Sequence, residues 1–206
     1  WTAGVGTDRR PVSGHNAPMF FTIPTLLTWA RIIAIPLIVG VFYLPLDVPT
    51  RNVVATTLFI VVALTDWLDG WLARRMNQTS SFGAFLDPVA DKFLVCAALL
   101  ILLQLDRVNA LVAFIIIGRE IAISALREWM AQIGASRSVA VNMLGKLKTM
   151  TQMVAIPLLL FDGALFGVVD TRIWGTALIY VACILTIWSM IYYMRKAMPE
   201  IRAKAR

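Results

Sequence analysis

The chain has 206 residues, of which 59% are apolar and 15% are charged, against roughly 25% charged in an average soluble domain. A globule of this size cannot bury so much apolar side chain, because small proteins have a high ratio of surface to volume. The composition therefore excludes a soluble enzyme, a disordered chain and a disulfide scaffold. A formal net charge of +7 is typical of a membrane protein that keeps basic residues on its cytoplasmic side, and we expect no nucleic-acid partner.

The first 18 residues differ in character from the rest of the chain. Residues 1–18 read WTAGVGTDRRPVSGHNAP and have neither helical periodicity nor the apolar stretch of a signal peptide. We expect them to be a remnant of an expression vector, with Met19 as the natural start. Residues 19–206 are then expected to form one membrane domain.

Six later stretches are long and apolar enough for a membrane span, which needs about 20 residues at a rise of 1.5 Å each. They are residues 23–43, 53–74, 82–103, 109–132, 144–161 and 173–194. The predicted fold is therefore all-α, with six transmembrane helices. The connections after spans one, three and five carry three Lys and Arg residues, whereas connections two and four, the span ends beside them and the C-terminal tail carry ten. Because basic residues collect on the cytoplasmic side, we expect both termini to be cytoplasmic.

Four acids lie near the predicted cytoplasmic ends of spans two and three. Helical spacing places Asp66 and Asp69 on one face of span two, and Asp87 and Asp91 on one face of span three. An acid near a helix centre costs about 2.5–3.5 kcal/mol on insertion scales, so the cluster needs protons, basic partners or bound cations. Carboxylate oxygens suit Mg²⁺ or Mn²⁺, and two such ions can serve phosphoryl transfer. The alternative is simple pairing with Arg74, Lys92 or Arg119.

The acids belong to a longer spaced motif: Asp66-x₂-Asp69-Gly70-x₂-Ala73-Arg74-x₈-Gly83-x₃-Asp87-x₃-Asp91. This motif resembles the signature of the CDP-alcohol phosphotransferases at every fixed position, and the six-helix layout of that family agrees with the predicted spans. Three outer blocks, at residues 23–36, 118–129 and 145–153, are similar to the bacterial phosphatidylglycerophosphate synthases within the family.

The resemblance implies transfer of a phosphatidyl group from CDP-diacylglycerol to sn-glycerol 3-phosphate, with release of CMP. It implies a homodimer with two divalent cations, Mg²⁺ or Mn²⁺, in the bacterial cytoplasmic membrane, with a cytoplasmic active site. Asp66, Asp69 and Asp87 would be metal ligands, and Asp91 would be both a ligand and the general base. The residues implied to contact the CDP part are Thr25, Thr28, Gly70, Arg74 and Ser80.

Glycerol 3-phosphate is a dianion, so its site needs basic residues. Arg119 and Arg127 lie on one face of span four, and Lys146 and Lys148 open span five. A deep arginine faces a polar cavity rather than lipid, so we expect this set to hold the phosphate. Alternatively, Arg119 pairs with an acid of its own helix such as Glu120, and the lysines are interfacial charge.

Other functions remain open on the sequence alone. The same chemistry could serve another acceptor, such as inositol phosphate or a phosphatidylglycerol lipid. The acids could also form the transport site of a divalent-cation transporter, although we find no paired broken helices or inverted repeat. A structural membrane protein with paired charges is the third possibility.

Overall fold

The structure is a computed structural model that describes residues 23–76, 81–134 and 143–204. Its helices are α1 (Ile23–Val41), α2 (Val48–Met76), α3 (Ser81–Gln104), α4 (Ala110–Gln132), α5 (Met143–Phe161) and α6 (Thr171–Lys204). A small antiparallel hairpin of β1 (Ala164–Leu165) and β2 (Val169–Asp170) joins α5 to α6. The all-α prediction is confirmed. The expected vector remnant at residues 1–18 lies outside the described residues.

Acidic caps decide where two of the helices begin. The backbone N–H of Thr50 donates to the Asp47 carboxylate at 3.1 Å, which lowers the pKa of Asp47 and starts α2 at Val48 rather than at residue 53 as predicted. Pro49 is tolerated in this first turn because an N–H there would have no helical partner. Asp170 caps α6 in the same way, accepting from the backbone N–H of Arg172 at 2.9 Å.

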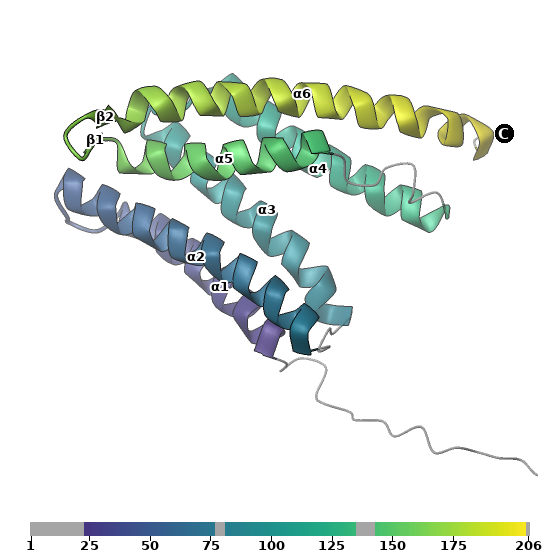
Figure 1. Ribbon diagram of the computed structural model, residues 1–206, viewed down its shortest axis with the longest axis horizontal. Helices are drawn as coiled ribbons and strands as arrows, with labels where there is room; N and C mark the ends of the chain where they lie inside the picture. The colour runs from purple at the N-terminus through teal and green to yellow at the C-terminus, as the bar shows by residue number, and fades with distance from the viewer. Residues whose placement is uncertain (1–22, 77–80, 135–142, 205–206) are drawn as a thin grey trace, which may run out of the picture.

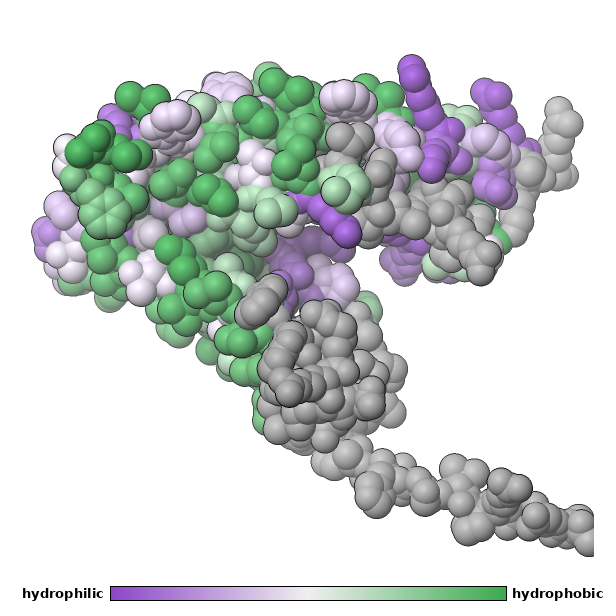
Figure 2. Space-filling model, viewed as in Figure 1, coloured by the Kyte–Doolittle hydropathy of each residue, from purple (hydrophilic) through white to green (hydrophobic). Residues whose placement is uncertain are grey.

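The helices form two groups that converge at one end. α1 packs against α2 and α3, while α6 packs against α5 and α4, and α2 contacts α5. The main apolar core lies where the groups converge and includes Phe59, Leu99, Ile116 and Ile156. Figure 1 shows the α1–α2 and α5–α6 connections at this converging end and the C-terminus at the other end. The two groups diverge toward that other end, where Figure 2 shows a hollow with hydrophilic residues inside it.

The outer surface is strongly apolar. By length and composition, the segments Val48–Asp66 and Thr171–Arg202 of the described helices can each cross a membrane, and the apolar segment Leu26–Val41 is shorter. Large apolar side chains face outward, among them Phe114 at 74% exposed, and Figure 2 shows that such residues cover much of the visible face of the two helix groups. An apolar surface this wide marks contact with a membrane or with other proteins.

Arg107, in the turn between α3 and α4, joins several elements at the converging end. Its guanidinium donates to the carbonyls of Leu159 at 3.1 Å and Leu160 at 2.8 Å, in the last turn of α5, where carbonyls lack helical partners. It also donates to Asn52 of α2 at 3.1 Å and pairs with Asp162 at 3.1 Å. One buried side chain therefore satisfies polar groups from α2, α5 and the following turn.

We expect Arg107→Ala to lower the free energy of unfolding by about 2–4 kcal/mol, because the substitution leaves buried polar groups without partners. The matched control is Arg172→Ala, since Arg172 is 57% exposed and lies 3.9 Å from the same acid, Asp162. A pair this exposed contributes about 0–1 kcal/mol. Thermal unfolding in detergent micelles measures both variants, and an equal loss in the two would contradict the assigned role of Arg107.

Candidate functional site

Two acids of the motif, from different helices, share one arginine. Arg31 Nη1 of α1 lies 2.9 Å from Asp66 Oδ1 of α2 and 2.8 Å from Asp91 Oδ1 of α3. The Arg31 side chain is 0% exposed, whereas those of Asp66 and Asp91 are 39% and 42% exposed. The structure thus brings these two predicted site residues together around a buried positive charge, and leaves part of each carboxylate accessible.

A third acid contacts the same helix. The Thr28 hydroxyl donates to Asp87 Oδ1 of α3, and Thr28 lies one turn before Arg31, so both side chains are on the same face of α1. Pro88 follows Asp87 inside α3 and removes one backbone hydrogen bond from the turn that carries the acids. The polar face of α1 therefore contacts three of the four motif acids.

A cavity of about 270 Å³ opens beside the Asp66–Asp91 pair. Besides these two acids, its wall includes Lys92, Glu120, Arg127, Lys148 and Gln152. It therefore joins the acidic ends of α2 and α3 to basic residues of α4 and α5. Figure 2 shows hydrophilic surface in the hollow between the two helix groups. The motif acids lie on the α2–α3 side with Lys92, and Arg127 and Lys148 lie on the α4–α5 side with Glu120. Such a cavity can hold a phosphate ester beside a carboxylate base.

Glu120 organises the basic side of this cavity. The Lys148 ammonium donates to Glu120 Oε1, and Arg119 Nη1 lies 3.5 Å from the same oxygen. Arg119 also donates to Ser189 Oγ of α6 at 3.1 Å. Arg119 therefore does pair with an acid of its own helix, which was the alternative that the sequence left open.

The four predicted phosphate-binding residues are placed differently. Arg127 and Lys148 line the cavity, whereas Arg119 and Lys146 are not among its lining residues. Arg119 is buried behind Glu120, and Lys146 is exposed. The Arg127 guanidinium lies 5.3 Å from the centre of the Tyr193 ring, a cation–π contact that directs it from α4 toward α6. The geometry therefore favours Lys148 over Lys146 as a ligand for an anion in this cavity.

The sequence that builds this site matches a known protein family. Residues 21–188 match the family described as CDP-alcohol phosphatidyltransferase. The chain belongs to the CDP-alcohol phosphatidyltransferase family. The resemblance drawn from the spaced motif is thereby confirmed.

Several bacterial relatives of this CDP-alcohol phosphatidyltransferase match over most of their length. A protein of Salmonella choleraesuis (strain SC-B67) is 48% identical, and proteins of Escherichia coli (strain K12) and Shigella boydii serotype 4 (strain Sb227) are each 49% identical. Each match spans 189 residues and covers 89% of this chain and 98% of the relative. All three relatives are named CDP-diacylglycerol–glycerol-3-phosphate 3-phosphatidyltransferase.

Some predicted site residues of this CDP-alcohol phosphatidyltransferase cannot be placed. The side chains of Thr25, Asp69 and Arg74 lie outside those that the structure describes, and so does the burial of Gly70, although the backbones of all four residues belong to α1 and α2. Ser80 lies outside the described residues altogether. Among the side chains that are described, no group of three His, Cys, Asp or Glu residues is placed to hold a metal ion. The roles predicted for these residues remain predictions.

Arg31 and Glu120 occupy central positions that the sequence did not assign to them. Arg31 is a lone basic residue within an apolar stretch, and such a residue needs a polar partner inside a membrane. That signal was present, but it does not identify the partner. Glu120 was predicted only as a possible partner of Arg119, and its contact with Lys148 depends on how α4 and α5 lie relative to each other.

Proposed function

We propose that this family member transfers the phosphatidyl group of CDP-diacylglycerol to sn-glycerol 3-phosphate, giving phosphatidylglycerophosphate and CMP. The observation that carries the proposal is the cavity in which Asp66 and Asp91 line one space with Arg127 and Lys148. The names of the relatives, at 48% and 49% identity over nearly their full length, agree with that substrate pair.

The reaction needs a general base and residues that bind the phosphate of the acceptor. Asp91, with 42% of its side chain exposed, takes the proton from the glycerol 1-hydroxyl, because an alcohol is a poor nucleophile at neutral pH. The freed oxygen forms a bond to the phosphorus that carries the diacylglycerol, and the bond from that phosphorus to the CMP oxygen breaks. Arg127 and Lys148 hold the acceptor phosphate, and Glu120 keeps Lys148 in position. Of the other two residues predicted for this role, Arg119 contacts the cavity only through Glu120, and Lys146 lies outside the cavity wall.

Two divalent cations, Mg²⁺ or Mn²⁺, complete the proposed site. Carboxylate oxygens are their preferred ligands, and Asp66 and Asp91 already converge on a single positive group. Asp66, Asp69, Asp87 and Asp91 would hold the ions. When bound, the ions neutralise the pyrophosphate and stabilise the charge that develops on the leaving CMP. Thr25, Thr28, Gly70, Arg74 and Ser80 form the proposed contacts to the CDP part.

The membrane setting belongs to the same proposal. The six helices cross the bacterial cytoplasmic membrane, and the chain works as a homodimer with both termini and the active site on the cytoplasmic side. The apolar segments of α2 and α6 and the outward-facing large apolar residues support a lipid environment. The tail and the connections on the side of the motif acids hold most of the basic residues, as cytoplasmic segments do.

The direct test is CMP release by the purified full chain in detergent, with CDP-diacylglycerol, Mg²⁺ or Mn²⁺, and a panel of acceptors. We expect glycerol 3-phosphate to give product, and inositol phosphate and phosphatidylglycerol to give little. If product formed only with another acceptor, the proposed phosphatidyl transfer would stand, but glycerol 3-phosphate would not be the acceptor. Metal flux into proteoliposomes without CMP release would instead favour a cation transporter.

Lys148→Ala is expected to raise the apparent KM for glycerol 3-phosphate about tenfold or more, because a hydrogen bond to a charged group contributes about 1.5–3 kcal/mol. The KM for CDP-diacylglycerol should change little. The matched control is Lys146→Ala, which removes the same charge one half-turn away, outside the cavity wall. Initial rates of CMP release at varied acceptor concentration give both values, and equal KM changes for the two variants would contradict the preference for Lys148.

A further inference from the structure

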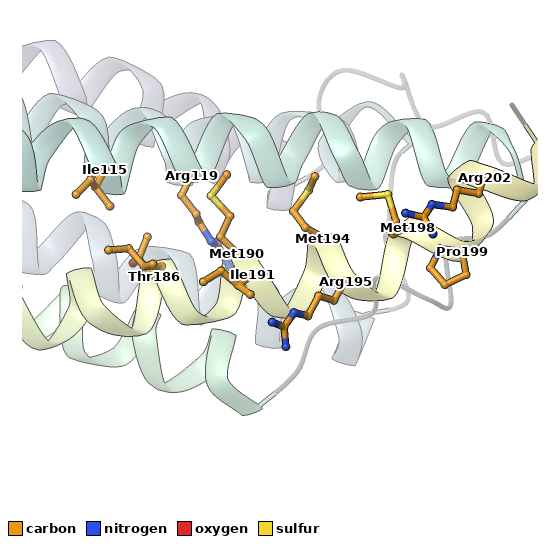
Figure 3. A pocket seen from close by; sticks show the side chains of 11 residues that line it. Ile115, Arg119, Thr186, Met190, Ile191, Met194, Arg195, Met198, Pro199 and Arg202 are labelled. Atoms are coloured by element: carbon orange, nitrogen blue, oxygen red, sulfur yellow. The ribbon is translucent and has the colours of Figure 1, made fainter.

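A second cavity, of about 870 Å³, lies between α4 and α6. Apolar side chains supply most of its wall, including Ile115 of α4 and Ile187, Met190, Met194 and Met198 of α6. Figure 3 shows Ile115, Met190, Met194 and Met198 along the gap between the two helices. The mechanism proposed above uses none of them. This α4–α6 groove is therefore a long apolar channel separate from the wall that carries the motif acids.

One end of the α4–α6 groove is basic. Arg195 and Arg202 line it, are both exposed, and lie seven residues apart, so both are on the same face of α6. The described part of the chain gives neither arginine an ion-pair partner, and none of the described residues that line the groove is acidic. Two uncompensated guanidinium groups thus stand at the mouth of an apolar channel.

The length of α6 places this basic mouth at the level of the lipid headgroups. A bilayer core of about 30 Å takes about 20 helical residues, so a crossing that begins near Ile173 ends close to Met194. Arg195 then lies at the edge of the hydrocarbon, and Arg202 lies about 10 Å beyond it. Met190 and Ile187 lie inside the hydrocarbon. Two arginines thus lie at the headgroup level, and apolar side chains line the groove through the hydrocarbon as far as Arg119 at its inner end. This order is that of a site for an anionic phospholipid.

We propose that the α4–α6 groove binds an anionic phospholipid of the surrounding membrane, with its phosphate between Arg195 and Arg202 and an acyl chain along Met194, Met190 and Ile187. The proposal rests on the membrane setting of the proposed function and not on its reaction. Arg119 lines the inner end of the groove and reaches Glu120 of the catalytic cavity. The bound lipid is therefore adjacent to the residues that we assign to the acceptor phosphate.

Native mass spectrometry of the full chain in detergent tests the proposal, with phosphatidylglycerol and phosphatidylcholine of identical acyl chains as probes. We expect tight retention of one phosphatidylglycerol and weak retention of phosphatidylcholine. Arg202→Ala should weaken phosphatidylglycerol binding about fivefold, since each basic residue near an anionic lipid surface contributes about 1 kcal/mol, and Arg195→Ala with Arg202→Ala should weaken it further. Met194→Trp should block the channel and remove binding while both arginines remain.

Lys196→Ala is the matched control, because it removes one positive charge next to Arg195. The Lys196 ammonium lies 5.0 Å from the centre of the Tyr192 ring, and Lys196 does not line the groove. It should leave phosphatidylglycerol binding within twofold of wild type. Equal losses in Lys196→Ala and Arg202→Ala would show general surface attraction and overturn the proposal. Full binding of phosphatidylglycerol in Met194→Trp would also overturn the proposal. If Met194→Trp changed the oligomeric state but not lipid binding, the groove would be a subunit interface, and the proposal would be wrong as well. Unchanged unfolding temperatures confirm that the variants are folded, and none of these readouts depends on catalysis.

Discussion

Asp91→Asn is expected to abolish CMP release almost completely. Asparagine keeps the shape of the side chain but is neutral, so it does not accept the proton of the glycerol hydroxyl, and its amide oxygen binds a divalent cation more weakly than a carboxylate does. Loss of a general base alone costs about 10²–10⁴ in rate, and loss of a metal ligand adds to that. The measurement is CMP release from CDP-diacylglycerol and glycerol 3-phosphate with saturating Mg²⁺ or Mn²⁺.

The control for this variant is Asp106→Asn. Asp106 lies in the turn after α3, at the converging end of the molecule and away from the acids, and its φ of 54° is a left-handed conformation that asparagine tolerates well. Asp106 is exposed, and surface substitutions usually change stability by no more than about 0.5 kcal/mol, so the control should retain activity within about twofold of wild type. If Asp91→Asn kept more than a tenth of the wild-type rate, Asp91 would not be the base, and a structural role for the acids would gain weight.

Most of the helical architecture could be predicted from the sequence, because apolar stretches of about 20 residues usually form membrane-spanning helices. The residues at which the helices begin and end were harder to predict, since they depend on individual contacts. α2 starts early because the side chain of Asp47 caps it. α6 continues to Lys204, past the predicted end and through Pro199, because Tyr193 and Ala197 are buried against Ile123 and Met130 of α4. Such packing is invisible to a count of apolar residues along one segment.

The site was predictable to the extent that spacing along one helix determines it. The spacing of Asp87 and Asp91 places both on one face of α3, and the structure gives both a polar partner from α1. The identity of those partners could not be predicted, because Thr28 and Arg31 are about 60 residues away in the sequence. The same holds for Lys148 of α5, whose partner Glu120 lies on a different helix, α4. Local periodicity indicates which face of a helix is polar, whereas the packing between helices determines which residues that face contacts.

The position of Arg31 leads to the second prediction with a large effect. In Arg31→Gln, Asp66 and Asp91 lose the guanidinium that both contact at 2.9 and 2.8 Å, and the two carboxylates face each other. Breaking a fully buried pair costs about 3–5 kcal/mol, but these carboxylates are 39% and 42% exposed, so water screens part of the repulsion. We expect an unfolding free energy about 1–3 kcal/mol below wild type in the absence of divalent cations.

Addition of Mg²⁺ or Mn²⁺ should raise the unfolding temperature of Arg31→Gln more than that of wild type. A cation that binds only the folded state stabilises it in proportion to its affinity, and in wild type that cation competes with the Arg31 guanidinium for Asp66 and Asp91. Arg31→Lys keeps the charge and should resemble wild type, while Arg51→Gln, the same type of substitution at the far end of α2, should change neither value by much. Thermal unfolding in detergent, without cation and with cation at about ten times its Kd, compares wild type with the three variants. At that concentration, binding contributes about 1.4 kcal/mol. An Arg31→Gln chain with wild-type stability and a wild-type response to Mg²⁺ would mean that Arg31 does not occupy the place of the cation between the two acids.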